Sequence, residues 1–333
     1  MQKKAFLLLS LILLFYAKNH AQEGIVLQTD YLAENMMLIH PGMTGANLIG
    51  SRLLLGVRKQ WFNLENAPQT NILSFETSML STAAVGLIAY NDRNGSFQRN
   101  SIFLSYAYKI NLTEEVWNTR RPFPTKNDSA KQLLFGISLG NFNTTIDQND
   151  FSENITDPAI GENITPGSYR NINVGVAYTA TKISLQLSAK NFPLSNNTDN
   201  RIVSPNILEE KNFKHYLLGG QFRFFVFEEV TLEPSLLVQY FTNTKNQLYD
   251  FSFKGSKLFR RGRIWGGLSY RNNFDRFDDQ EINLNNRIAF NSFSSLFGVN
   301  YKNFMLSYQY TKVLGDNNLN DQGHHFLILG FQF

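Results

Sequence analysis

In the stretch Phe304-Met305-Leu306-Ser307-Tyr308-Gln309-Tyr310, every second side chain is Phe, Leu or Tyr. Successive side chains of a β-strand point to opposite faces of the sheet, so this alternation predicts a strand with one apolar and aromatic face. The stretch Ile183-Ser184-Leu185-Gln186-Leu187-Ser188-Ala189 alternates in the same way, and residues 327–333 place Leu and Phe on one face. The chain is therefore expected to be an all-β protein.

Segments of this kind recur along the chain, separated by polar turns. Fourteen strands are predicted, at residues 51–60, 70–79, 83–91, 98–110, 131–146, 169–180, 181–191, 214–225, 230–241, 246–258, 262–272, 286–299, 304–313 and 324–333. About ten residues is the length that a tilted strand needs to cross a bilayer. Strands with an apolar face toward lipid and a polar face toward a lumen also explain why 29 Phe and 14 Tyr coexist with a mean hydropathy of only −0.25. The predicted fold class is a transmembrane antiparallel β-barrel of about 14 strands, with a short N-terminal plug or periplasmic segment.

The first 21 residues have the order of a secretory signal peptide: two lysines at positions 3 and 4, an apolar run at 5–17, and the small residue Ala21 before Gln22. The apolar run is shorter than the roughly 20 residues of a membrane-spanning helix, and no later stretch approaches that length. We expect cleavage after Ala21, export, and residence in a bacterial outer membrane. Cleavage removes three lysines, so that 31 basic residues become 28 against 27 acidic ones. The resulting charge near +1 gives little support to a nucleic-acid-binding function.

The mature chain is expected to divide into an N-terminal segment at residues 22–50 and the barrel at 51–333. Part of the N-terminal segment, residues 30–39, could form a short helix. A barrel of this size encloses a space that its own side chains do not fill. The segment is therefore expected to plug the lumen, with a position at the periplasmic mouth as the alternative. The chain has no cysteine, so its stability must come from a large cooperative fold.

The lengths of the connections favour a barrel with an even number of strands, in which short turns lie on the periplasmic side. The connections after even-numbered strands are short at 80–82, 226–229, 259–261 and 300–303, and those after odd-numbered strands are mostly longer. The connection at 111–130 is the exception, because it follows an even strand and is long. It carries Glu114, Glu115, Trp117, Arg120 and Arg121. It is either an insertion or an error in the strand count, or it is a docking surface for a periplasmic partner.

Motifs of enzymes and metal sites are weak in this sequence. Gly136-Ile137-Ser138-Leu139-Gly140 fits the G-x-S-x-G pattern of hydrolases, but it lies inside an alternating strand and no helix pattern follows it. His324 and His325 are adjacent, so in a strand they point to opposite faces and cannot share a metal ion. We expect no catalytic residue, no metal and no cofactor.

Three stretches of the N-terminal third are similar to the PorP/SprF family of type IX secretion system outer-membrane proteins. The first is His40-Pro41-Gly42-Met43-Thr44-Gly45, where the family has Asn-Pro-Ala-Tyr-x-Gly, so that His40, Gly42 and Met43 depart from the pattern. The second is Arg58-Lys59-Gln60-Trp61 followed by Ala67-Pro68-Gln69-Thr70, which resembles R-x-Q-W…A-P-x-T. The third runs from Val85-Gly86-Leu87 to Ser105-Tyr106-Ala107-Tyr108, and residues 323–333 resemble the closing strand of the family.

The resemblance implies a non-enzymatic outer-membrane barrel that supports export and surface anchoring of a cognate adhesin, or that links the outer membrane to a periplasmic ring. Its implied partners are the ring lipoprotein with its peptidoglycan-binding protein, the C-terminal domain of a large secreted adhesin, or both, in bacteria with gliding motility. The residues predicted to bind partners are Pro41, Gly45, Arg58, Gln60, Trp61, Pro68, Trp117, Arg120 and Arg121. The alternatives are an outer-membrane diffusion channel or hydrophobic-solute transporter with an N-terminal plug and, as a third hypothesis, a membrane-embedded hydrolase.

Overall fold

The structure is a computed structural model, and it describes residues 35–46, 48, 50–60, 67–95, 97–113, 130–146, 167–194, 214–242, 246–274, 291–314 and 323–333. Within these residues the chain begins with two 3-10 helices, η1 (Met36–Leu38) and η2 (Pro41–Met43), and continues as strands. The strands are β1 (Ser51–Gln60), β2 (Gln69–Leu80), β3 (Ala83–Asn94), β4 (Phe97–Asn111), β5 (Lys131–Ile146), β6 (Gly167–Ala180), β7 (Ile183–Pro193), β8 (His215–Phe222), β9 (Phe224–Phe225), β10 (Val230–Phe241), β11 (Gln247–Phe259), β12 (Gly262–Phe274), β13 (Asn291–Tyr301), β14 (Phe304–Leu314) and β15 (His324–Gln332).

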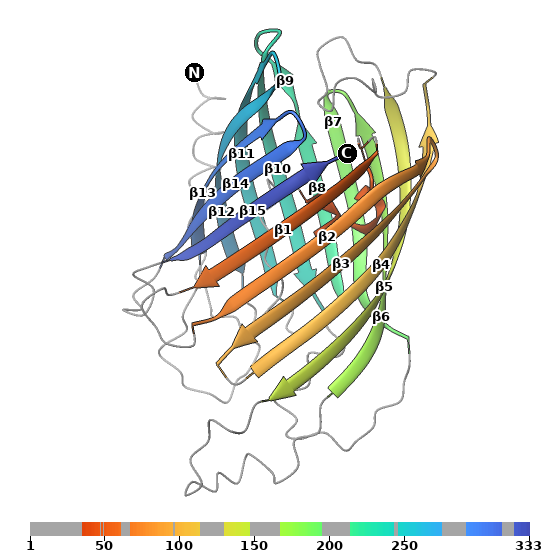
Figure 1. The fold of residues 1–333 in the computed structure, drawn as a ribbon, viewed down its shortest axis with the longest axis vertical. Helices are drawn as coiled ribbons and strands as arrows, with labels where there is room; N and C mark the ends of the chain where they lie inside the picture. The colour runs from red at the N-terminus through yellow and green to blue at the C-terminus, as the bar shows by residue number, and fades with distance from the viewer. Residues whose placement is uncertain are drawn as a thin grey trace, which may run out of the picture.

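The strands close into a barrel (Figure 1). Each long strand pairs antiparallel with the next one along the chain, and β15 pairs with β1. Leu55 in β1 therefore lies opposite Leu73 of β2 on one side and opposite Leu329 of β15 on the other. The result is a closed antiparallel barrel of 14 strands with one short extra strand, β9, which confirms the predicted fold class.

The two faces of the barrel wall are inverted relative to a water-soluble protein. Large apolar side chains lie outside, where Leu104 is 60% exposed and Phe297 52% exposed. Polar side chains lie inside, where Ser294 is 1% exposed and Asp250 is fully buried. Such an apolar exterior is stable only where lipid replaces water, because each of these side chains would otherwise hold apolar surface in water. The observed faces are those expected from the alternation in the sequence.

The short turns and the C-terminus lie together at the upper rim of the barrel in Figure 1. Turns at 81–82, 181–182, 260–261 and 302–303 join consecutive strands at this rim. The closing strands meet here as well, because the Ser51 and Phe333 backbones donate to each other at 2.7 and 2.9 Å. Gly50 turns the chain into β1 with φ +78, in the left-handed region that favours glycine. The connections that were expected to be short periplasmic turns are thus short where the structure describes them, and they lie on one side of the barrel.

Three details differ from the expected strand boundaries. The segment expected at 214–225 is divided at Arg223 into β8 and β9, which pair with β10 in one continuous register. The strand expected at 181–191 begins two residues later, after a turn. The strand expected at 286–299 is β13 from Asn291, and residues 286–290 lie outside the described residues.

No helix in the described ranges is long and apolar enough to span a membrane.

Candidate functional site

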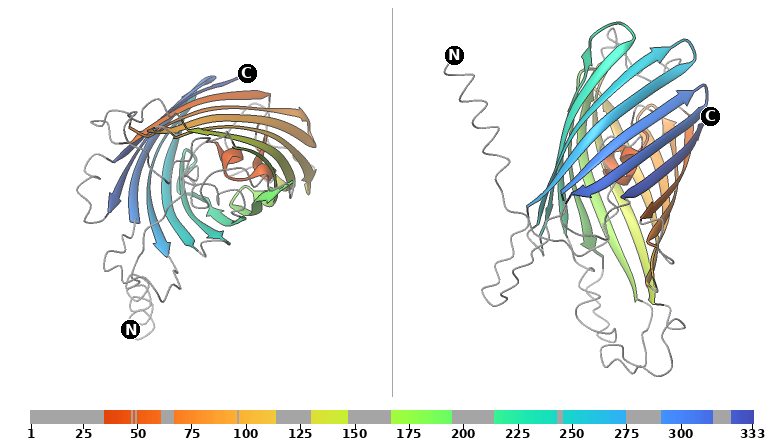
Figure 2. Two further views of the ribbon diagram at one scale, coloured as in Figure 1. Left: turned by 90° about the horizontal axis from the view of Figure 1, so that it is seen from below. Right: turned by 90° about the vertical axis from the view of Figure 1, so that its left-hand side faces the viewer.

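A stretch of chain that precedes the first strand lies inside the barrel (Figure 2). We call residues 35–46 the lumenal segment. Its Met37 and Leu38 join a buried cluster with side chains of β1, β2, β3 and β15. Its Ile39 packs against Leu217 and Leu237 on the opposite wall, and its Met43 packs against Leu134 of β5. The segment therefore contacts walls on both sides of the lumen rather than lining one strand.

The wall beneath the lumenal segment is made of small residues. Ala84, Ala107, Gly136, Gly175 and Ser188 lie directly opposite one another on the consecutive strands β3 to β7. We call them the small-residue row. Side chains on one strand alternate between the faces, so paired positions share a face, and in this row the shared face is the lumen. The row leaves room for a polypeptide backbone to lie against the sheet.

The lumenal segment uses that room at very short range. A Cβ on Gly136 would lie 2.2 Å from the backbone nitrogen of Gly42, and a Cβ on Gly175 would lie 2.5 Å from Cε1 of His40. In β3, a Cβ on Gly86 would lie 2.1 Å from Sδ of Met37. Real Cβ atoms do not approach other atoms so closely, and at Gly136 the obstacle is backbone that cannot rotate away. Glycine is thus required at position 136 for the segment to dock, whereas at positions 175 and 86 a Cβ would displace the side chains of His40 and Met37.

The peptide groups on both sides of Gly45 are held by buried groups of opposite charge. The Gly45 N–H donates to Oε2 of Glu76 at 2.6 Å, and the Gly45 carbonyl accepts from Nζ of Lys109 at 2.5 Å. Lys109 also donates to Ser78, and the Arg52 guanidinium donates to the Glu76 carboxylate through Nε at 2.8 Å. Removing one partner of a buried charged set leaves the others uncompensated. Gly45 itself has φ +61, which disfavours any other residue there.

His40 fixes the middle of the lumenal segment to β7. Its Nε2 lies 2.8 Å from the backbone oxygen of Leu187, so that nitrogen carries the proton and donates it. Burial, with a smaller contribution from the nearby Lys190 ammonium, lowers the pKa of the His40 imidazole from 6.5 to about 4. The imidazole is therefore neutral at pH 7. Lys190 donates to the carbonyl oxygen of Leu38 at 3.1 Å, so that β7 holds the segment at two points.

The predicted partner-binding residues fall into two separate groups. Pro41 and Gly45 are buried in the lumenal segment and contact the barrel wall. Arg58 and Gln60 lie on the inward face at the end of β1 remote from the short turns, and the Gln60 N–H donates to the oxygen of the buried Pro68 at 3.0 Å. Arg58 Nη2 lies 3.1 Å from His324 Nδ1. Trp61, Trp117, Arg120 and Arg121 lie outside the described residues.

The sequence interpretation did not identify the wall residues that hold the lumenal segment, such as Glu76, Lys109, Gly136, Gly175 and Lys190. Glycine at inward positions of successive strands was the available signal. It becomes visible only once the register places Gly136 opposite Gly175.

The inward faces of the described strands carry an excess of positive charge. Nine inward-facing Arg and Lys side chains and four inward-facing carboxylates give this wall a net charge of +5. The described residues of the lumenal segment have no charged side chain, so they do not balance it. The cations are Arg52, Arg58, Arg99, Lys109, Lys190, Arg223, Lys254, Arg263 and Arg271, and the carboxylates are Glu76, Asp92, Glu233 and Asp250.

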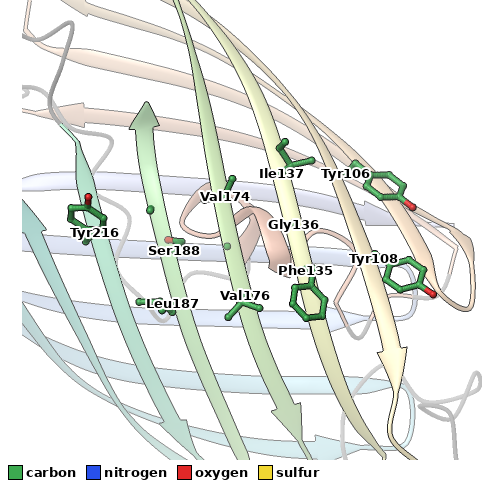
Figure 3. A pocket seen from close by; sticks show the side chains of 12 residues that line it. Tyr106, Tyr108, Phe135, Gly136, Ile137, Val174, Val176, Leu187, Ser188 and Tyr216 are labelled. Atoms are coloured by element: carbon green, nitrogen blue, oxygen red, sulfur yellow. The ribbon is translucent and has the colours of Figure 1, made fainter. Parts of the chain in front are cut away.

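Behind the lumenal segment, the lipid-facing surface has an apolar groove of about 610 Å³ (Figure 3). Tyr106 and Tyr108 on β4 bound one side of it and Tyr216 on β8 bounds the other. Gly136 and Gly175 contribute to its floor, and the same two residues contact the segment from inside. Only the backbone of β5 and β6 separates the groove from the lumenal segment at this point.

Neither catalysis nor metal binding is indicated by the geometry of the described residues. In those ranges no group of three or more His, Cys, Asp or Glu side chains could hold a metal ion. The serine of the G-x-S-x-G pattern, Ser138, is an inward-facing residue in the middle of β5. It lacks the strand-to-helix turn that makes such a serine a nucleophile.

Solved structures with a similar fold are membrane barrels of low sequence identity. The chain is similar to the TodX monoaromatic hydrocarbon channel in its deltaS2 mutant, with a TM-score of 0.52 at 9% identity, over 91% of this chain and 95% of that one. This likeness shows the fold alone. The translocator domain of the autotransporter NalP from Neisseria meningitidis matches with a TM-score of 0.32 at 8% identity, over 86% and 90% of the two chains. BamA from Haemophilus ducreyi, lacking POTRA domains 1–3, matches with a TM-score of 0.42 at 9% identity, over 85% of this chain and 70% of that one.

No curated protein sequence matches the chain. The model of one protein family, described as type IX secretion system membrane protein PorP/SprF, matches residues 20–331. That match covers nearly the whole chain. It includes the lumenal segment and every strand, with β15 matched as far as Phe331. The protein is accordingly an outer-membrane β-barrel, and it belongs to the PorP/SprF family of type IX secretion system membrane proteins.

Proposed function

We propose that this barrel is a non-enzymatic component of type IX secretion that supports export and surface anchoring of a cognate adhesin, or that links the outer membrane to the periplasmic ring. The observation that carries the proposal is the family match over residues 20–331. The inverted faces of the closed barrel agree with it, because they suit a protein that stays in the outer membrane and meets partners at its two rims.

Two regions are proposed to contact partners. One is the rim around Arg58, Gln60, Trp61 and Pro68, remote from the short turns, which suits the C-terminal domain of a secreted adhesin. The other is the connection at 111–130, which joins β4 to β5 on the side of the short turns and carries Trp117, Arg120 and Arg121. This connection suits the ring lipoprotein and its peptidoglycan-binding partner. Pro41 and Gly45 contribute indirectly, by holding the lumenal segment against the wall.

An affinity pull-down from detergent-solubilised outer membranes, followed by mass spectrometry, tests this function. Wild-type barrel is expected to recover type IX secretion components, a large adhesin, or both. Arg120→Ala together with Arg121→Ala is expected to reduce recovery of periplasmic components. The matched control is Arg260→Ala with Arg261→Ala, which removes the same charges from the β11–β12 turn on the same side. Recovery of neither a secretion component nor an adhesin by the wild type would contradict the proposal.

The second candidate is a diffusion channel or hydrophobic-solute transporter with an N-terminal plug. The observation that favours it is the lumenal segment, which occupies the place of a plug. Conductance of the purified barrel in planar bilayers separates the two functions. A large, steady pore without any co-purifying secretion protein would favour the channel.

A further inference from the structure

We propose that the lipid-facing surface beside the short turn of β13 and β14 binds one anionic phospholipid. Its phosphate would lie on cations of the short turns, and an acyl chain would lie in an apolar groove next to them. The groove is formed by outward residues of β13, β14, β15 and β1 and has a volume of about 360 Å³. Ligand sites in proteins have volumes of about 300–1,000 Å³, so the groove can hold part of a lipid. This inference does not depend on the secretion role, because lipid surrounds the barrel in either candidate function.

Two rows of outward side chains form the groove, across the strands where the barrel closes (Figure 1). The row next to the short turn is aromatic. In it Tyr301 lies opposite Phe304, and Phe304 lies opposite Phe331 with 5.1 Å between the two ring centroids. The row below is aliphatic and consists of Val299, Leu306, Leu329 and Leu55 on consecutive strands. Aromatic rings are typical of the headgroup level of a membrane, so the groove matches a lipid whose headgroup points toward the turn.

The short turns next to the groove carry positive charge. The turn of β13 and β14 contains Lys302, and the turn of β11 and β12 consists of Arg260 and Arg261, all three exposed. The two turns are in contact, because the backbone N–H of Lys302 donates to the carbonyl oxygen of Arg261 at 2.8 Å. Within the described ranges these three side chains form no ion pair with the protein. A phosphate bound here would therefore accept charge-assisted hydrogen bonds from cations that are still available.

Lys302 connects the charged turns to the groove. Its Nζ lies 5.7 Å from the centroid of the Tyr301 ring, and Tyr301 lines the groove. The ring of Phe259, which precedes Arg260, stacks with Tyr301 at a centroid distance of 6.4 Å, so both turns reach one aromatic surface. A single lipid can thus contact the cations and the aliphatic row together. An anionic headgroup is favoured over a zwitterionic one, because the ammonium group of a zwitterionic headgroup would be repelled by the same cations.

Other charges at this rim lie away from the groove. Among the described short turns, acidic residues occur in the turn before β10, as Glu228 and Glu229. The carbonyl oxygen of Glu229 accepts from the N–H of Leu258 in β11 at 2.8 Å, so this turn lies on the far side of β11 from β13. Lys182 in the turn of β6 and β7 is exposed at the same rim, beside strands that do not line the groove. Lys182 therefore provides a control for positive charge without a groove.

Native mass spectrometry of the detergent-purified barrel tests the site with phosphatidylglycerol and phosphatidylethanolamine of identical acyl chains. The first phosphatidylglycerol is expected to bind at least fivefold more tightly than the first phosphatidylethanolamine. Lys302→Glu with Arg261→Glu is expected to weaken phosphatidylglycerol binding at least fivefold without weakening phosphatidylethanolamine binding, and Lys182→Glu should change neither. Excess glycerol 3-phosphate should not displace the lipid. Equal affinities of the wild type for the two lipids would overturn the proposal, as would a preference that survives the reversal of Lys302 and Arg261.

Filling the groove tests the place of the acyl chain. Leu329→Trp puts a large ring into the aliphatic row and is expected to weaken binding of both lipids at least threefold. The matched control is Leu268→Trp, at an exposed position of β12 outside the groove, which should leave binding unchanged. Unchanged binding to Leu329→Trp would overturn the assignment of the groove to an acyl chain.

Each variant is first checked for the heat-modifiable mobility of a folded barrel on semi-native gels. If the charge reversal does not fold, Lys302→Gln with Arg261→Gln takes its place, with the same expected loss of preference for phosphatidylglycerol. The assay uses only the purified barrel and lipid, so a failed pull-down of secretion partners leaves its result intact.

Discussion

Gly136 and Gly220 are both strand glycines, but only Gly136 lies too close to another part of the chain to accept a Cβ atom. A Cβ on Gly136 would lie 2.2 Å from the backbone nitrogen of Gly42, whereas a Cβ on Gly220 would meet only Cδ2 of Leu185 at 3.7 Å. Gly136→Ala is therefore expected to destabilise the docked barrel by about 1–3 kcal/mol, the usual cost of overpacking, and Gly220→Ala to have little effect. The temperature at which the barrel loses its fast mobility on semi-native gels measures both variants. Equal midpoints would contradict close packing at Gly136.

His40 gives the lumenal segment a pH dependence. Its pKa is lowered to about 4 when docked and is about 6.5 when exposed, so the undocked segment binds the proton more readily. Docking is at full strength above pH 6.5 and weakens as the pH falls toward 4, by up to about 3 kcal/mol. The groups facing the imidazole are Lys190 and the backbones of Val176 and Leu187.

The comparison of wild type with His40→Gln isolates this effect, because other titrating groups are common to both proteins. Urea midpoints at pH 7.5 and pH 4.5 are expected to differ more in the wild type than in the variant. The same pH dependence in both proteins would show that His40 is not buried as neutral imidazole.

At the residue scale the sequence predicted that Pro41 and Gly45 bind partners, which stays a prediction. In the structure both residues contact the barrel's own wall. Gly136 was noticed only as part of an enzyme-like pattern. Its actual partner, Gly42, lies 94 positions earlier in the chain, and no local pattern encodes that proximity.

At the scale of elements, the lumenal segment is expected to contribute much of the stability of the barrel. It buries Met37, Leu38, Ile39 and Met43, and each such side chain is worth about 1.5–3 kcal/mol, or roughly 6–12 kcal/mol together. Replacing residues 35–46 by a Gly/Ser linker of equal length should lower the thermal midpoint strongly while the β-sheet circular dichroism remains. The same variant should conduct ions more readily in planar bilayers. An unchanged midpoint and conductance would contradict a docked segment.

The strands themselves were largely predictable from the sequence, because alternation of apolar and polar residues follows directly from the two faces of a wall between lipid and lumen. The boundaries shift by a few residues where turns intervene, as at 181–182 and at Arg223. The expected short helix at 30–39 is present in the described residues only as the 3-10 helix η1 (Met36–Leu38). Packing across the lumen, rather than local helix preference, fixes the conformation of this stretch.

At the scale of the whole molecule, closure is the property on which the other conclusions depend. The sequence indicated it through the parity of connection lengths and through the chain's similarity to a membrane family. It could not give the register of β1 against β15, because these strands are joined by hydrogen bonds between opposite ends of the sequence. The positive wall was equally hidden, because cations from many strands converge only after closure. Residues 22–333 are nearly neutral by composition, while the inward wall of the described strands carries a net positive charge.

A pair of engineered disulfides tests closure most directly. Leu55→Cys with Leu329→Cys joins β1 to β15, and Leu55→Cys with Leu73→Cys joins β1 to β2, in both cases through outward-facing residues. Paired positions on neighbouring strands have Cβ atoms about 4.5–5.5 Å apart, within reach of a disulfide after a small adjustment. A closed barrel predicts that both pairs cross-link in folded protein. Cross-linking of residues 55 and 73 without cross-linking of residues 55 and 329 would show an open sheet and contradict the account.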